Sequence, residues 1–129
     1  MPVLGGHPVL VVDPDEDAAA AQTAVLRLHG FDAQSARTAR EAATAVELFR
    51  PRVVVTSFSL PDADGCDVAR HARRQPDPPS VVVVSGRTDK ASRSAALAAG
   101  AAAYLLKPVA PAELADLVRR LAVPVSSRR

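Results

Sequence analysis

The chain is poor in the residues that build disulfide frameworks and base-stacking surfaces. It has one cysteine, one tyrosine and no tryptophan, and aromatic residues make up 3% of its 129 residues. The single Cys66 cannot form an internal disulfide, and few aromatic side chains are available to stack on nucleic-acid bases. Uncharged stretches such as Ala95 to Leu106 are shorter than the roughly 20 apolar residues of a membrane-spanning helix. The start of the chain does not resemble an export signal. We therefore expect a cytoplasmic protein that does not enter a membrane.

The small net charge of the chain excludes a strongly basic protein of the kind that binds nucleic acids. Sixteen Lys and Arg residues face 14 Asp and Glu residues, so the net charge is only +2. Basic residues do gather at Arg70 to Arg74 and again near Arg119, but we interpret both clusters as solvated surface, so nucleic acid is not an expected partner. Hydrophobic residues make up 48%, enough for one folded domain. We place that domain at residues 8–122, between an N-terminal arm over 1–7 and a flexible tail over 123–129.

Apolar runs alternate with helical patterns along the whole chain. Four of these runs are predicted strands: Val9 to Val12, Val53 to Ser57, Val81 to Val84 and Ala103 to Leu106. The segment Phe31 to Ala36 is short and polar enough to be a fifth, edge strand. A helical pattern follows each run, and the second begins at Thr38-Ala39-Arg40-Glu41, which has capping-box spacing. Short connections between buried strands and helices indicate right-handed βαβ units. The sequence predicts an α/β fold, a doubly wound parallel sheet with helices on both faces.

The functional crevice of such a sheet lies beyond the carboxyl ends of its strands. Four polar residues fall there: Asp13, Ser57, Ser85 and Lys107. The histidines have no metal-ligand spacing with Cys66 or with one another, so no metal site is predicted.

Several short motifs occur in a characteristic order: Val9-Leu10-Val11-Val12-Asp13, Leu60-Pro61-Asp62-Ala63-Asp64-Gly65, Ser85-Gly86, Gly100-Ala101 and Tyr104-Leu105-Leu106-Lys107-Pro108. With this order and spacing, the chain resembles the receiver domain of two-component response regulators, from Val9 to about Ala122. The resemblance implies a flavodoxin-like (βα)5 three-layer sandwich with strand order 2-1-3-4-5 and a cis Lys107–Pro108 bond. It also implies phosphorelay signalling, in which an Asp ending the third strand is phosphorylated with the help of Mg²⁺.

The chain departs from this family at two positions of the phosphorylation pocket. The phosphoacceptor position is Ser57, and the second of two acids after the first strand is Pro14. A full pocket has three carboxylates and one Lys, formally −2, whereas Asp13 and Lys107 sum to zero. Each charge pair at ~4 Å is worth about 4 kcal/mol at an effective dielectric of ~20, so attraction for Mg²⁺ should be lost or weak. Asp15 is displaced by one residue, which re-aims its side chain. We expect a pseudo-receiver with no catalytic residue and no cofactor.

The other pocket positions have structural interpretations as well. Ser85 matches the hydroxyl residue that contacts the phosphoryl group, but a turn hydrogen bond suits it equally. Lys107 matches the phosphoryl-gripping Lys and is expected to pair with Asp13. Tyr104 matches an aromatic residue that swings between exposed and buried positions. Ser57 is expected to be an ordinary hydrogen-bonded serine. Asp62 and Asp64 are expected to serve turns and helix caps.

Three functions stay open. The first is a phosphorylation-independent protein-interaction module, whose partner would be a kinase or an output protein. Its expected binding face, which also suits self-association, comprises Asp89 to Ala99, Ala103 to Leu106 and Pro111 to Ala122. The second is a receiver phosphorylated on Asp13 or Asp15. The third is an enzyme, because Asp13-Pro14-Asp15 also resembles the nucleophile motif of haloacid-dehalogenase-like phosphatases, although no late acidic pair follows to hold Mg²⁺.

Overall fold

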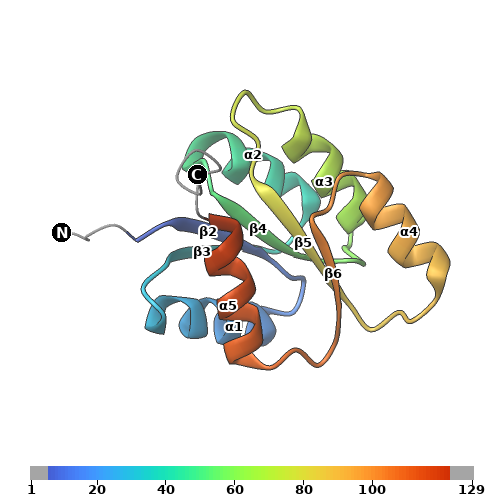
Figure 1. Ribbon diagram of the computed structural model, residues 1–129. Helices are drawn as coiled ribbons and strands as arrows, with labels where there is room; N and C mark the ends of the chain where they lie inside the picture. Colours follow the sequence, from blue (N-terminus) through green and yellow to red (C-terminus); the bar gives the residue numbers. More distant parts are fainter. Residues whose placement is uncertain (1–5, 123–129) are drawn as a thin grey trace.

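The computed structural model describes residues 6–122 (Figure 1). The predicted tail and residues 1–5 of the predicted arm lie outside the described residues. The strands are β2 (Pro8–Val12), β3 (Asp32–Ala36), β4 (Val53–Ser57), β5 (Ser80–Ser85) and β6 (Ala103–Leu106). The helices are α1 (Glu16–Leu28), α2 (Ala39–Phe49), α3 (Gly65–Arg73), α4 (Lys90–Ala98) and α5 (Pro111–Ala122).

The five strands form one parallel sheet in the order β3-β2-β4-β5-β6. In terms of the predicted strands this is the order 2-1-3-4-5, so the predicted doubly wound, flavodoxin-like topology is confirmed. The central strand β4 is buried along its whole length, which explains its unbroken run of β-branched residues. The edge strand β3 buries only Ala33 and Ala36, which explains its polar sequence.

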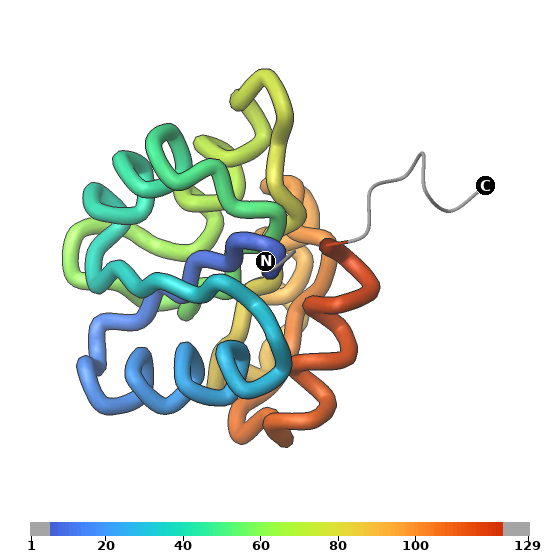
Figure 2. The backbone as a smooth tube through the Cα atoms, turned by 90° about the vertical axis from the view of Figure 1, so that its left-hand side faces the viewer, coloured from blue at the N-terminus to red at the C-terminus, as the bar shows by residue number. Residues whose placement is uncertain are grey.

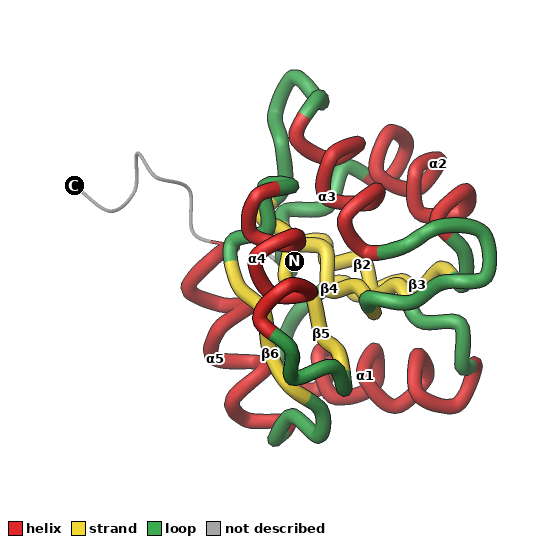
Figure 3. The backbone as a smooth tube through the Cα atoms, turned by 90° about the vertical axis from the view of Figure 1, so that its right-hand side faces the viewer, coloured by secondary structure: helices red, strands yellow, loops and turns green. Residues whose placement is uncertain are grey.

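Helices cover both faces of the sheet and create two separate cores. On one face, α2, α3 and α4 bury residues such as Val46, Val68 and Ala96 against the sheet. On the other face, α1 and α5 pack Leu26, Leu114 and Val118 against it. Figures 2 and 3 show these layers from opposite sides, with α2 and α3 on one side of the strands and α1 on the other. Within residues 6–122, none of the helices has the length and hydrophobicity to cross a bilayer.

Acidic and hydroxyl side chains begin the helices at the carboxyl edge of the sheet. Asp15, Asp64 and Asp89 are the N-caps of α1, α3 and α4. Thr38 caps α2 by accepting a hydrogen bond from the Glu41 N–H at 3.0 Å. The capping box predicted there is incomplete, because the Glu41 carboxylate accepts from the N–H of Arg37 instead of that of Thr38. A full capping box forms at α3, between Asp64 and Asp67.

A close backbone approach fixes the loop that follows β4. A Cβ atom on Gly65 would lie 2.9 Å from the carbonyl oxygen of Ser57, closer than a side chain tolerates. The Gly65 N–H also donates to the Phe58 carbonyl at 2.7 Å. Glycine at 65 therefore lets α3 begin directly beside the end of β4, where Ser57 lies.

Candidate functional site

A solvent-accessible hollow of about 290 Å³ lies at the carboxyl edge of the sheet. Its lining includes all six residues predicted from the sequence to form the pocket: Asp13, Pro14, Asp15, Ser57, Ser85 and Lys107. They come from four segments far apart in the chain, which the parallel sheet brings together at one edge. Phe58 and Arg87 also line the hollow, and the sequence did not single them out.

Asp13 is the buried charge of this hollow, with 3% of its surface exposed. Its Oδ1 accepts a hydrogen bond from the N–H of Asp15 at 2.9 Å, and its Oδ2 accepts one from Gln22 Nε2 at 3.1 Å. The Lys107 Nζ lies 3.9 Å from the same Oδ2, so the two side chains are placed as the expected ion pair. The Lys107 side chain is 46% exposed, and its ammonium group therefore remains largely hydrated.

The other two residues that follow β2 lie at the surface. Pro14 is exposed and has no carboxylate to contribute. The Asp15 side chain is used as the N-cap of α1, where its Oδ1 accepts from the Asp17 N–H at 3.0 Å. Within the described part of the chain, no group of three His, Cys, Asp or Glu side chains is close enough together to hold a metal ion.

Ser57 is the last residue of β4 and is 6% exposed. That Ser57 is an ordinary hydrogen-bonded serine stays a prediction: the residue lines the hollow, where water can bond to its hydroxyl. The carbonyl of Ser57, by contrast, accepts a hydrogen bond from Thr56 Oγ1 at 3.0 Å. Among the described residues, no buried polar side-chain atom lacks a hydrogen-bond partner.

Ser85 makes the turn hydrogen bond that was one of its two predicted interpretations. Its Oγ accepts from the N–H of Arg87 at 2.9 Å, directly after β5. The Lys107 N–H donates to the Ser85 carbonyl at 2.9 Å, which ties β6 to the same point. The Lys107–Pro108 peptide bond is cis, as the sequence resemblance implied.

Tyr104 is held inward by a small aromatic cluster. It is 7% exposed, and its hydroxyl donates to the Arg87 carbonyl at 2.8 Å. The Phe58 ring meets the Tyr104 ring edge-on at 6.5 Å between centroids, and the Arg87 guanidinium lies 5.1 Å from the centre of the Phe58 ring. These contacts connect β6, the loop after β4 and the loop after β5 beside the hollow. Sequence reasoning missed Phe58 and Arg87 because both contacts are long-range.

The loop after β4 is attached to α2 through Asp62. Its carboxylate accepts hydrogen bonds from the backbone N–H groups of Ala39 at 2.9 Å and Arg40 at 3.0 Å. The bond from Ala39, followed by that from Arg40, holds the pKa of Asp62 below its usual range, despite an opposing effect of desolvation. The sequence predicted a capping role but not that the capped helix is α2, which precedes Asp62 in the chain.

Comparison with known proteins supports the resemblance seen in the sequence. Residues 9–119 match the family described as Response regulator receiver domain. The DNA-binding response regulator MtrA of Mycolicibacterium paratuberculosis is 38% identical over 111 residues, which cover 86% of this chain and 49% of MtrA. The transcriptional regulatory protein PrrA of Mycobacterium tuberculosis is 38% identical over 113 residues, covering 88% of this chain and 48% of PrrA. The chain thus spans about half the length of the curated relatives it matches.

Solved structures agree in fold. A response regulator signal receiver domain from Bermanella marisrubri superposes with a TM-score of 0.83 at 33% identity, covering 92% of this chain and 99% of that one. The receiver domain of the putative response regulator NarL from Mycobacterium tuberculosis gives a TM-score of 0.84 at 26% identity, covering 91% and 96%. Receiver domains of this family interact with kinases and output domains in two-component signalling. The order of the strands, the hollow at their carboxyl ends and the match over residues 9–119 together show that this chain belongs to the response regulator receiver domain family.

Proposed function

We propose that this domain is a pseudo-receiver, a protein-interaction module of signal transduction that works without aspartyl phosphorylation. The observation that carries the proposal is Ser57, which stands at the end of β4 where the family resemblance expects the phosphoacceptor carboxylate. A serine hydroxyl cannot form the acyl phosphate of an aspartate. On this proposal the domain is a binding module and not an enzyme.

The donor set of the hollow does not fit Mg²⁺. Mg²⁺ needs near-octahedral oxygen ligands and is usually held by carboxylates. Pro14 offers none, and the Asp15 side chain caps α1. Both oxygens of Asp13 already accept hydrogen bonds, and Lys107 places a positive charge 3.9 Å from one of them. The hollow therefore lacks the carboxylates that would hold this ion.

The position of Tyr104 supports independence from phosphate. In the family that the chain resembles, the aromatic residue at this position moves between exposed and buried positions. Here its inward position is stabilised by the Arg87 carbonyl and the Phe58 ring. Neither contact needs a phosphoryl group, so we infer that the domain keeps one conformation of this region in the absence of any phosphodonor.

The face through which the module binds is formed on this proposal by α4, β6 and α5. Leu97 of α4 is 40% exposed and Leu106 of β6 is 49% exposed, so two large apolar side chains on this face are available to a partner. Exposed leucines also occur on α1 and α2, at Leu28 and Leu48, so the choice of this face rests mainly on the family resemblance. A kinase, an output protein or a second copy of the chain are the candidate partners.

Incubation with acetyl phosphate and Mg²⁺, followed by intact-mass measurement, tests this function. We expect no phosphoryl adduct on the wild-type domain. The double variant Ser57→Asp, Pro14→Asp restores the family's acids and is the positive control. A wild-type adduct that maps to Asp13 or Asp15 would replace this proposal with a receiver phosphorylated on another acid. Mg²⁺-dependent phosphatase turnover that is lost in Asp13→Asn would instead identify a haloacid-dehalogenase-like enzyme.

A further inference from the structure

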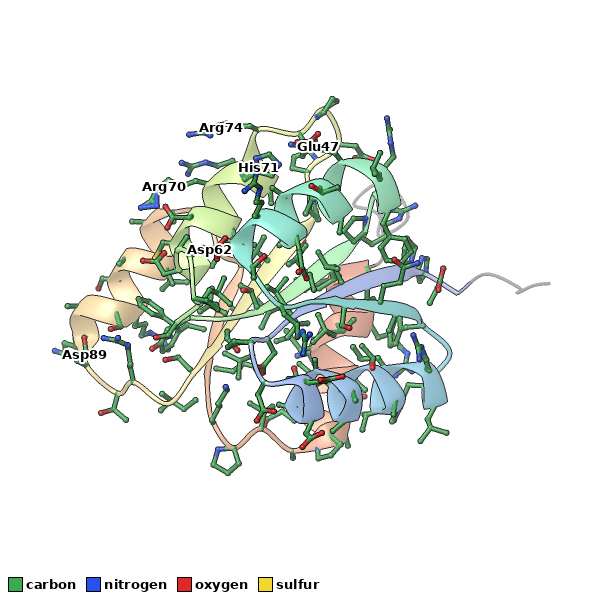
Figure 4. All side chains as sticks on the ribbon, turned by 180° about the vertical axis from the view of Figure 1, so that it is seen from behind. Glu47, Asp62, Arg70, His71, Arg74 and Asp89 are labelled. Atoms are coloured by element: carbon green, nitrogen blue, oxygen red, sulfur yellow. The ribbon has the colours of Figure 1, made fainter. Side chains whose placement is uncertain are left out.

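Three arginines gather at the C-terminal end of α3, on a surface that the pocket does not use. Arg70, Arg73 and Arg74, here called the arginine ridge, are all exposed. Figure 4 shows Arg70 and Arg74 on the outer side of α3, pointing away from α2. His71, by contrast, points toward α2, where its Nε2 lies 3.1 Å from the Glu47 carboxylate. The ridge therefore faces solvent, and His71 belongs to the contact between the helices.

The guanidinium groups of the ridge have few partners within the molecule. Arg70 makes one contact of 3.4 Å with Asp67, and both side chains are about half exposed, so this pair is worth little. Arg73 and Arg74 make no side-chain hydrogen bond or ion pair among residues 6–122. Arg119 differs, because it contacts Asp116, the His29 carbonyl and the Phe31 ring. The basic cluster of α5 is thus partly structural, whereas that of α3 has free donors.

The segment that carries the ridge has more basic than acidic residues. Between Gly65 and Leu106 the chain has six Lys and Arg residues but only three Asp and Glu residues. Two of these acids serve helix caps: Asp67 accepts from the Asp64 N–H at 3.1 Å, and Asp89 accepts from the Ser92 N–H at 2.8 Å. Up to Asp64 the balance is reversed, with nine acids and five bases. The ridge therefore belongs to a stretch of the sequence in which basic residues outnumber acidic ones.

We propose that the arginine ridge is a docking surface for an extended acidic segment of a partner protein. Residues 70 and 74 are one turn apart, about 6 Å along the helix. Alternate residues of an extended chain are about 6.6 Å apart and point to the same side, so alternating carboxylates match the ridge. Arginine binds carboxylates in bidentate geometry, which a lysine cannot reproduce.

A protein segment fits this surface better than a nucleic acid does. The ridge itself contains no aromatic side chain on which bases could stack, and the whole chain has a net charge of only +2. The surface also differs from the α4–β6–α5 face and from the hollow. The proposal therefore stands whether or not Ser57 prevents phosphorylation, and it adds a second contact region to the domain.

Titration of the ¹⁵N-labelled domain with a peptide of alternating Glu and Ser residues, at about 0.05 M salt to limit screening, tests the proposal. We expect saturable shifts at residues 70–75 and in the neighbouring turn at 98–101, where Arg73 lies over Gly100. The variant Arg70→Glu, Arg74→Glu should weaken binding about tenfold, and Arg70→Lys, Arg74→Lys should weaken it less. Arg120→Glu removes a basic residue of α5 and is the matched control, with unchanged affinity.

Several results would overturn the proposal. The first is an absence of shifts at the ridge, and the second is saturable shifts centred on another surface. The third is an affinity of the Arg70→Glu, Arg74→Glu variant within twofold of the wild-type affinity, measured on a variant whose NMR spectrum shows that it is folded. Single-stranded DNA or anionic lipid vesicles that bind the ridge more tightly than the peptide at the same salt would also contradict it, because the ridge would then serve phosphates. Preference for the peptide supports the proposal.

Discussion

The Asp13 carboxylate lies 3.9 Å from the Lys107 ammonium group, across the hollow between the ends of β2 and β6. The carboxylate is buried and keeps two hydrogen bonds, whereas the Lys107 side chain is half exposed. On the proposed function, this pair has a structural role.

The pair predicts a modest and specific effect on stability. Lys107→Met should lower the free energy of unfolding by about 0.5 to 1 kcal/mol, because Asp13 loses a screened counter-charge but keeps its hydrogen bonds. A double-mutant cycle with Asp13→Asn in urea denaturation should show coupling of similar size. Lys90→Met, at an exposed position of α4, is the control and should change stability little. A stabilised Lys107→Met variant would contradict this role of the pair.

The inward position of Tyr104 can be followed directly, since it is the only tyrosine and the chain has no tryptophan. We expect its fluorescence to be poorly quenched by acrylamide, and to stay so when acetyl phosphate and Mg²⁺ are added. Phe58→Ala removes the ring that packs against it and should increase quenching. Tyr104→Phe should cost about 1 kcal/mol of stability through loss of the hydrogen bond to Arg87. A change of quenching caused by the phosphodonor alone would show that a switch survives.

The attachment of the β4–α3 loop to α2 through Asp62 should weaken at low pH. Its folded-state pKa lies below the ordinary value of 3.8, so its stabilisation is fully present above that value and is lost as the pH falls through the folded-state pKa. Asp62→Asn should therefore be less stable than the wild type at neutral pH, and the two unfolding curves should converge in strong acid. Asp77→Asn, at an exposed loop position, is the control and should change stability little at neutral pH. Parallel curves for Asp62→Asn and the wild type would show that the carboxylate charge is irrelevant to the cap.

The close approach of Gly65 to the Ser57 carbonyl predicts that one added methyl group at position 65 destabilises the domain. Gly65→Ala should destabilise the domain by about 1 to 3 kcal/mol, because the new Cβ meets a backbone oxygen that cannot move without disturbing β4. Gly86→Ala is the matched control, since no heavy atom lies within 4 Å of the added Cβ. Denaturation midpoints for the two variants test the difference. Equal midpoints would mean that the start of α3 adapts freely.

The sequence predicted the order and type of every element because most strands are apolar runs bounded by turn residues and the polar β3 lies at the edge of the sheet. It also predicted which side chains meet at the hollow, since parallel strands all end at one edge. It could not predict contacts that depend on tertiary distance. The hydrogen bonds from Ala39 and Arg40 to Asp62 join positions more than 20 residues apart. The packing of Arg87 on Phe58 likewise depends on side-chain placement that no local pattern encodes.

Mg²⁺ titration followed by NMR tests the account most directly. We predict that the wild-type domain shows no saturable shifts around Asp13 and Ser85 at millimolar Mg²⁺, and that the Ser57→Asp, Pro14→Asp variant acquires them. Saturable Mg²⁺ binding at the wild-type hollow would contradict the account, because a pocket that recruits the ion without these carboxylates could also support phosphoryl chemistry.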